Sequence, residues 1–382
     1  MRVRRVQLNH KNDITFELLD EHDQPIPAVS GFMRHLRARG KSPNTLSAYA
    51  YDLLHFMRFL TQHQLIYETF APTHAWSFLE YLREVPSRTQ VQRLGLVLCT
   101  TDQERPAIRL SSSTINRILA AVSSFYEYLI LSGLLIDKEN PIQRGDDPTT
   151  ARVAERHRPF MGRASRQRPI RRTVRVKTVQ RIPRPMDDDH VSKLLASLRL
   201  KRDRAMILLM LHGGLRPGEV LNLHLDDISY ARKRVVVRYR DDHPKGARTK
   251  SRTERVVDLL QSETLQAVSD YVMHERPRDV ESSHVFLVGG RGKRRGEPLS
   301  YAALVKLFER HCEQLGIREP WITPHALRHT HATAMWEGGM RELALQKRLG
   351  HASPESTHIY TQISDPAMVA EYRHALGTEE TE

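Results

Sequence analysis

The sequence predicts a mainly α-helical chain with a small antiparallel β-sheet, which is an α+β fold in two domains. Long stretches repeat apolar residues at three- and four-residue steps, and two β-branched runs flank a turn-rich stretch. An arginine- and proline-rich segment separates the patterned regions, and 382 residues can supply two ordinary cores. We therefore expect an N-terminal extension over 1–24, a helical domain over 25–145, a linker over 146–185 and a second domain over 186–382.

The helical domain carries clear start and stop signals. Ser42 is a typical N-cap, and Pro43 suits the first helical position. One apolar face then follows at helical spacing through Leu46, Tyr49, Leu53, Phe56 and Leu60. A second long helix has an apolar face of Ile115, Ile118, Val122, Phe125, Tyr128 and Leu129. Gly133 ends that helix, and shorter helices over 28–38 and 73–83 complete a four-helix plan.

The segment between the patterned regions is strongly basic. Residues 151–185 hold eleven arginines and one lysine against a single glutamate, which is most of the formal net charge of +14. Four prolines and little apolar periodicity are typical of an extended linker. A solvated tail is the ordinary interpretation of such a run, but its place between two domains favours a segment that tracks DNA. The candidate DNA-binding residues are Arg163, Arg166, Arg168, Arg171, Arg172 and Arg175.

The composition limits the partner and the compartment. A net charge of +14 and a pI of about 9.9 indicate a polyanionic partner. Cys99 and Cys312 are too few and too far apart for a disulfide framework or a zinc cluster, which fits a reducing compartment. The first residues lack the apolar core of a signal peptide, and the longest apolar run is far short of a membrane span. We expect a soluble cytoplasmic protein without a membrane partner.

The second domain mixes helices with a hairpin. Helices are expected in DDDHVSKLLASL and RDRAMILLMLHGGL. The strands RKRVVVRYR and RTERVVDL flank a turn-rich stretch, which predicts a β-hairpin with Lys250 at its edge, on a mobile element. Helices are expected to return from residue 300 onward. One of them, HALRHTHATAMWEG, places His325 and Arg328 on one face because they are three residues apart.

Six residues of the second domain form an ordered set that suits the cleavage of a phosphodiester without a metal. They are Arg216, Lys250, His325, Arg328, His351 and Tyr360. The five-coordinate transition state gains negative charge on its non-bridging oxygens, and two guanidiniums can grip those oxygens as rigid forks. A tyrosine can be the nucleophile, and a lysine can protonate the leaving alkoxide.

Simpler interpretations exist for single residues. His325 and His329 could share a helix face and bind zinc, but Ala326 stands where the zinc-protease pattern needs Glu. A metal-dependent nuclease could be built from carboxylates at Asp187, Asp188, Asp189, Asp226, Asp227, Asp241 and Asp242. Those carboxylates look more like a helix start and hairpin caps. Each simple interpretation is reasonable for one residue, but all of them would have to be true at once. The six residues also occur in a fixed order, so the phosphodiester chemistry is the better interpretation.

The strings around these residues resemble the tyrosine recombinase (phage integrase) family. GLRPGEVLNL resembles the family's first-arginine box, with Arg216 and its acidic companion Glu219. The other boxes are matched by TKSRTERVVDL at Lys250, PHALRHT at His325 and Arg328, and LGHASPESTHIYT at His351 and Tyr360. The hairpin box lacks the glycines that often flank the family's lysine.

The resemblance implies a role for each residue. Tyr360 would attack the scissile phosphate and become joined to the 3′-phosphate, and Lys250 would protonate the leaving 5′-oxygen. His325 would accept the tyrosine proton. The phosphate contacts would come from Arg216, Arg328 and His351, with Glu219 in support of Arg216. No metal or other cofactor is implied.

The resemblance also implies a fold and partners. The N-terminal half would be a SAM-like core-binding domain, and the C-terminal half the catalytic domain of a site-specific recombinase. Double-stranded recombination sites, a tetramer on DNA, and accessory DNA-bending or directionality proteins would be its partners in a prokaryotic or phage setting. After Tyr360 the spacing predicts a helix with an apolar face of Met368, Val369, Tyr372 and Leu376. That face could pack on its own catalytic domain, but the resemblance favours docking into a neighbouring protomer.

Two other functions share parts of this pattern. A type IB topoisomerase uses a similar residue set to relax supercoils, and an inactive DNA-binding protein could keep the same fold. The basic linker and the nine-residue step from His351 to Tyr360 favour a recombinase over a topoisomerase. The presence of all six residues argues against an inactive protein.

Overall fold

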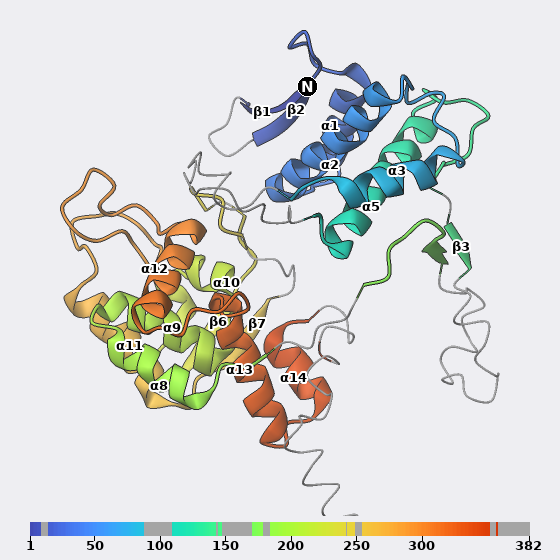
Figure 1. Ribbon diagram of the computed structural model, residues 1–382. Helices are drawn as coiled ribbons and strands as arrows, with labels where there is room; N and C mark the ends of the chain where they lie inside the picture. The colour runs from blue at the N-terminus through green and yellow to red at the C-terminus, as the bar shows by residue number, and fades with distance from the viewer. Residues whose placement is uncertain are drawn as a thin grey trace, which may run out of the picture. The chain divides into compact units, whose positions relative to one another are not determined.

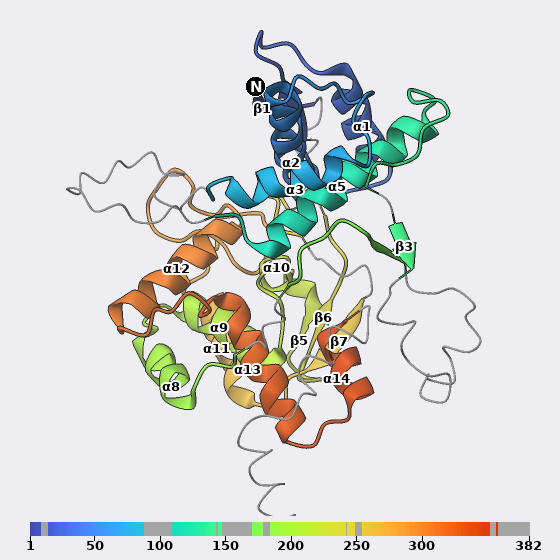
Figure 2. The same ribbon diagram turned by 45° about the vertical axis from the view of Figure 1, so that its right-hand side comes forward.

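A computed structural model describes residues 1–8, 14–87, 109–142, 144–146, 170–178, 184–241, 243–248, 254–351 and 357. The chain divides into two compact units, Met1–Gln180 and Arg181–Glu382. Each unit is mainly helical, and the described strands form three small antiparallel sheets (Figures 1 and 2). The predicted α+β fold class is confirmed.

The first unit begins with a β-hairpin, in residues that the sequence predicts only as an N-terminal extension. Strand β1 (Arg2–Gln7) pairs with β2 (Ile14–Leu19) in antiparallel register, with Arg2 opposite Leu19. Leu18 and Leu19 are fully buried. The hairpin lies beside the first two helices (Figure 1), so these residues contribute to the core of the helical unit.

The helices of the first unit match their predicted positions closely. They are α1 (Pro27–Ala38), α2 (Pro43–Gln62), α3 (His74–Glu84) and α5 (Ser112–Leu131). The Ser42 hydroxyl caps α2 by accepting the Thr45 N–H at 3.2 Å, as predicted. Gly133 follows α5 in the left-handed conformation, with a φ of 69°, so it ends that helix.

Part of the predicted linker packs on the first unit. A short pair of strands joins β3 (Arg144–Asp146) to β4 (Ile170–Arg172). The next residues lie against α5, where the Asn116 side chain donates to the Val176 carbonyl at 2.8 Å and accepts the Val176 N–H at 2.9 Å. The Arg175 side chain is exposed. Of the other candidate DNA-binding residues, Arg171 and Arg172 lie on β4, and Arg163, Arg166 and Arg168 lie outside the described residues.

The second unit is built around α9 (Lys201–Gly213), whose residues 205–210 are fully buried. Helices α11 (Ser262–His274) and α13 (Pro324–Glu337) pack on it. The other helices are α8 (Asp188–Ser197), α10 (Pro217–Leu221), α12 (Tyr301–Gln314) and α14 (Glu342–Leu349), with a 3₁₀ turn η2 (Leu225–Asp227). Helices α12, α13 and α14 confirm the expectation of helices from residue 300 onward, and α11 is a further helix that the prediction did not include.

The predicted hairpin is confirmed. Strand β6 (Arg234–Val237) pairs with β7 (Arg255–Asp258), and the short β5 (Ile228–Ser229) adds a third strand. Strand β7 lies beside α14, as Figure 2 shows. Within the part of the chain that the structure describes, no helix is long and apolar enough to cross a membrane.

Candidate active site

A sharp turn after α9 places Arg216. Gly214 ends α9 with a φ of 62°, a left-handed conformation that favours glycine. A Cβ there would also lie 2.5 Å from Cδ2 of the His331 ring. Arg216 follows as the N-cap of α10, with Pro217 at the first helical position. The backbone thus turns within a few residues to bring an arginine next to α13.

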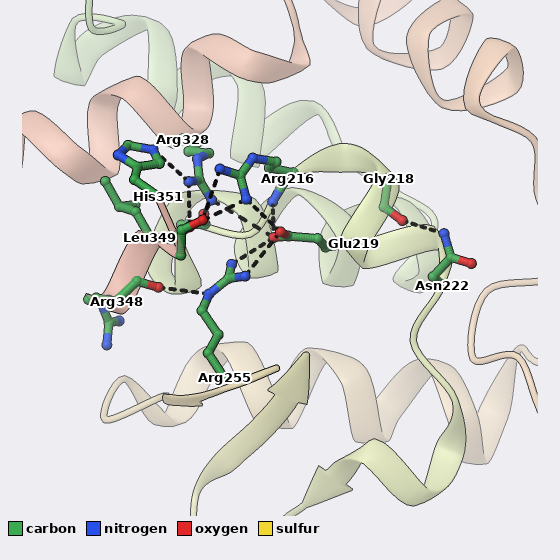
Figure 3. A network of polar contacts seen from close by, with 11 residues as sticks. Arg216, Gly218, Glu219, Asn222, Arg255, Arg328, Arg348, Leu349 and His351 are labelled. Carbon is green, nitrogen blue, oxygen red and sulfur yellow. Dashed lines mark hydrogen bonds and ion pairs between the residues drawn. The ribbon is translucent and has the colours of Figure 1, made fainter. Parts of the chain in front are cut away.

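Glu219 holds Arg216 from two sides. One carboxylate oxygen accepts the Arg216 backbone N–H at 2.8 Å, and the other accepts from the guanidinium at 2.7 Å (Figure 3). The Glu219 side chain is 1% exposed and that of Arg216 is 17% exposed. The predicted companion role of Glu219 therefore has a concrete form, because the carboxylate fixes both the backbone and the side chain of Arg216.

Arg328 comes to the same place from α13. Its guanidinium donates to the carbonyls of Gly214 and Leu349, each at 2.6 Å, and lies 3.8 Å from the Glu219 carboxylate. The side chain is 3% exposed. The Leu349 carbonyl also accepts from Arg216 at 3.4 Å, so one carbonyl at the end of α14 contacts both arginines (Figure 3).

His351 follows the end of α14. Its Nε2 accepts from Arg328 at 3.0 Å, so its Nδ1 carries the hydrogen and donates to the Thr357 hydroxyl at 2.8 Å. Burial, together with the charges of Arg328, Arg216 and Arg255, lowers the pKa of His351 to about 3. The imidazole is therefore neutral at physiological pH, and both of its nitrogens are engaged within the protein.

A third arginine, which the sequence analysis did not single out, completes the network. Arg255 of β7 binds Glu219 with two nitrogens, at 3.0 and 2.7 Å. Burial by itself raises the pKa of the Glu219 carboxyl, but Arg255, Arg328 and Arg216 outweigh it and lower that pKa to about 2. Three guanidiniums thus surround one carboxylate, which leaves a net positive charge that suits a phosphodiester anion.

Of the remaining predicted catalytic residues, the structure describes only His325. His325 lies on the first turn of α13 with an exposed side chain, although Arg328 one turn later is buried. Lys250 and Tyr360 lie outside the described residues. The structure brings together Arg216, Glu219, Arg328 and His351, four of the seven catalytic and supporting residues expected.

The metal alternatives gain no support. Among the described residues, no group of three His, Cys, Asp or Glu side chains is placed to hold a metal ion. Asp227 is buried and paired with Arg240 at 2.5 and 3.0 Å, and Asp188 and Asp189 occupy the first turn of α8. Asp242 lies outside the described residues.

A second polar layer under the site predicts acid sensitivity. The buried His331 donates through Nδ1 to the Leu211 carbonyl at 2.9 Å and accepts from Arg348 through Nε2 at 3.0 Å. Burial, and next the charge of Arg348, lower the pKa of His331 from 6.5 to about 3. As the pH falls, the unfolded chain protonates His331 before the folded chain does. The contribution of neutral His331 to the free energy of unfolding is therefore fully present above pH 6.5 and is lost between pH 6.5 and 3.

We therefore expect the free energy of unfolding to fall by roughly 2 kcal/mol per such histidine between pH 7 and pH 5. Urea unfolding of the wild type and of His331→Gln at both pH values measures the contribution of His331. The wild type should lose more stability than the variant over this interval. Equal losses would show that His331 is not buried in the neutral form.

Comparison with known proteins relates both units to one family. Residues 184–366 match the profile described as the phage integrase family, and residues 29–94 match its N-terminal SAM-like domain. The chain is 30% identical over 381 residues to transposase A from transposon Tn554 of Staphylococcus aureus, covering 100% of this chain and 99% of that protein. It is 28% identical over 344 residues to tyrosine recombinase XerC of Caldanaerobacter subterraneus, covering 89% and 84%.

Solved structures show the same fold. The Tn1549 transposon integrase in complex with circular intermediate DNA aligns with a TM-score of 0.56 at 18% identity, over 91% of this chain and 99% of that one. The XerH site-specific recombinase bound to its difH substrate aligns with a TM-score of 0.56 at 18% identity, over 92% and 86%. The predicted two-part arrangement of a SAM-like domain and a catalytic domain is confirmed at the level of fold.

Proposed function

Because this chain belongs to the phage integrase family of tyrosine recombinases, we propose that it is a site-specific recombinase that cuts and rejoins DNA through Tyr360. The observation that carries the proposal is the buried network in which Glu219 holds Arg216 and Arg255 beside Arg328. Such a network presents fixed positive charge without a metal. A phosphodiester is the ligand that this charge suits, and the strongly basic composition agrees with DNA.

The proposed cleavage is a transfer of the phosphoryl group from DNA to protein. The Tyr360 oxygen forms a bond to the scissile phosphorus as the bond to the 5′-oxygen breaks, while His325 accepts the tyrosine proton and Lys250 supplies one to the leaving oxygen. Arg216 and Arg328 neutralise the non-bridging oxygens. The phosphotyrosine keeps the energy of the original bond, so a second strand with a free 5′-hydroxyl can reverse the step.

For His351 we propose a positioning role in place of the direct phosphate contact that the resemblance implies. Its neutral ring has one N–H, which the Thr357 hydroxyl already accepts, and its other nitrogen accepts from Arg328. The ring therefore has no further hydrogen to give a phosphate. We infer that His351 orients Arg328 toward the DNA.

The path of the hairpin supports a position for Lys250 near the site. The Arg248 carbonyl would lie 2.7 Å from a Cβ on Gly218, so the backbone passes directly over the start of α10. Gly218 is two residues from Arg216, and Arg248 is two residues from Lys250. Lys245 is another lysine of the hairpin region that could act as the general acid, and its side chain pairs with Glu297.

Lys250→Ala should cleave ordinary DNA slowly but regain most of its rate when sulfur replaces the 5′-bridging oxygen of the substrate. The reason is that a thiolate leaves without needing a proton, so loss of a general acid no longer matters. Single-turnover cleavage of both substrates by wild type, Lys250→Ala and Lys245→Ala measures the effect. An equal defect of Lys250→Ala on both substrates would assign the general acid elsewhere, and a rescue confined to Lys245→Ala would assign it to that residue.

The direct test of the proposed function is cleavage of a nicked recombination site in the presence of EDTA. We expect a protein–DNA adduct that survives denaturation and a released strand that carries a 5′-hydroxyl, which a polynucleotide kinase can label. Cleavage that strictly requires magnesium, or a 5′-phosphate on the product, would contradict the tyrosine mechanism.

The partners and setting complete the proposal. We infer that the chain binds double-stranded recombination sites through its basic residues, and that four protomers assemble because four strands are exchanged. Accessory DNA-bending or directionality proteins and a place in the bacterial cytoplasm, on the DNA of a mobile element, fit the transposon and bacterial relatives. The predicted apolar face of Met368, Val369, Tyr372 and Leu376 lies outside the described residues. If this segment links protomers, truncation after Ile363 should leave half-site binding and abolish tetramers in light scattering.

A further inference from the structure

Arg255 occupies an inward position on a strand whose other face is exposed. On β7, Arg255 and Val257 are buried, whereas Val256 and Asp258 are exposed. The Arg255 side chain is 6% exposed and reaches toward the turn that carries Arg216 (Figure 3). A buried arginine on a strand is costly unless its donors are satisfied, so its contacts indicate what it does.

All three nitrogens of the Arg255 guanidinium have partners. Nη1 and Nη2 donate to the two oxygens of Glu219 at 3.0 and 2.7 Å, and Nε donates to the Arg348 carbonyl at 2.9 Å. Arg255 is 36 residues from Glu219 and 93 residues from Arg348 in sequence. One side chain thus ties the hairpin to the turn at α10 and to the end of α14.

The end of α14 is shaped to fit this guanidinium. Gly350 ends the helix with a φ of 65°, and a Cβ on it would lie 2.8 Å from Nη1 of Arg255 and 3.0 Å from its Cδ. The glycine lets the backbone lie directly against the arginine. The neighbouring Leu349 carbonyl, one residue after the Arg348 carbonyl that Arg255 binds, accepts from both Arg328 and Arg216.

We propose that Arg255 is a positioning residue that holds Arg216 and Arg328 in their orientation toward the scissile phosphate. The proposal rests on the proposed function and adds a residue to it. Arg255 occupies one edge of the Glu219 carboxylate, so the carboxylate cannot draw Arg328 closer than its present 3.8 Å. Without Arg255, the buried carboxylate would be compensated by Arg216 and Arg328 alone. Arg328 would then turn toward Glu219 and away from DNA, and Arg216 would lose the second cation that shares its carboxylate.

The chain offers a matched control in Arg240. This arginine also makes a two-pronged ion pair with a buried carboxylate, Asp227, and donates to the Asn222 carbonyl at 3.3 Å. Its side chain is 14% exposed, and it follows β6 of the same hairpin. Its partners Asp227 and Asn222 are different from the partners of Arg255, which are Glu219 and Arg348. Arg240→Met should therefore lower the thermal stability without a specific effect on cleavage.

The experiment compares two substrates, one with an ordinary scissile phosphate and one with a methylphosphonate there. A methyl group in place of a non-bridging oxygen removes the negative charge that the arginines neutralise. On ordinary DNA at saturating concentration, Arg255→Met should cleave roughly 100-fold more slowly than the wild type, as misplacement of reacting groups by about 1 Å can cost. The ratio of wild-type to variant rates should shrink to a few-fold on methylphosphonate DNA, and DNA affinity should be unchanged.

Arg255→Lys keeps a cation beside Glu219, so it tests the proposal even if Arg255→Met does not fold. A point charge cannot serve both carboxylate oxygens and the Arg348 carbonyl, so the lysine variant should fold yet show the same dependence on the substrate. A wild-type rate in Arg255→Lys and Arg255→Met, or an equal defect on both substrates, would overturn the proposal. Absence of any covalent adduct from the wild type would instead overturn the proposed function, and this inference with it.

Discussion

Tyr360→Phe is expected to abolish the covalent protein–DNA adduct while leaving DNA affinity within a few-fold of the wild type. The substitution removes only the nucleophilic oxygen and keeps the aromatic ring. Because phenylalanine cannot form a bond to phosphorus, cleavage should fall to the background level, which is the largest effect that any single substitution can have here. Denaturing gels of a nicked substrate measure the adduct, and a mobility-shift titration measures binding.

Tyr372→Phe is the matched control for this experiment. It removes a hydroxyl from a second tyrosine of the C-terminal segment and should leave adduct formation unchanged. An adduct that persists in Tyr360→Phe and disappears in Tyr372→Phe would move the nucleophile to Tyr372. Loss of DNA binding in Tyr360→Phe would show that the residue supports the fold, and the test of its chemistry would then rest on the DNA-linked peptide.

Arg216→Ala and Arg328→Ala should each raise the cleavage barrier by about 3 kcal/mol or more, which is a factor of at least about 100 in rate. In the proposed mechanism each guanidinium meets charge that develops on the phosphate oxygens, as donors do in an oxyanion hole. Lysine at either position should rescue poorly, because a single ammonium cannot span two oxygens. Single-turnover cleavage at saturating DNA measures these effects.

The two arginines should differ in their effect on folding. Arg328 is 3% exposed and donates to the carbonyls of Gly214 and Leu349, so its removal takes a short hydrogen bond from each of two buried carbonyls. Arg216 is 17% exposed, and its contacts with the carbonyls of Leu349 and Gly350 are long, at 3.4 Å. Thermal unfolding should therefore show a larger loss for Arg328→Ala. Full activity in Arg328→Lys would contradict the phosphate-binding role.

Much of the fold was predictable because local signals were strong. The caps at Ser42 and Gly133, and the β-branched runs of the hairpin, follow from short-range rules that tertiary contacts did not override. The N-terminal hairpin was missed because its strands carry charges that resemble those of a solvated extension. Helix α11 was missed although Leu265, Ala267, Val268 and Tyr271 lie buried along it.

The candidate site was predictable as a set of residue types, but not as a network. Glu219 accepts from Arg255 across 36 residues, and Arg328 donates to a carbonyl 21 residues away, and no local rule specifies such pairs. One signal could have identified Arg255. Arg255 lies two residues before Val257 in a run that alternates between the two faces of a strand, so both side chains point to the same, inward face. An arginine in an inward position needs a buried partner.

The proposed function requires that Tyr360 carries the DNA during strand exchange. Tandem mass spectrometry can identify the attached residue in the peptide that remains linked to DNA after cleavage, nuclease trimming and proteolysis. We predict a nucleotide linked through its 3′-phosphate to Tyr360, in a sample prepared with EDTA throughout. A nucleotide attached to any other residue, or cleaved DNA without an attached peptide, would contradict the account.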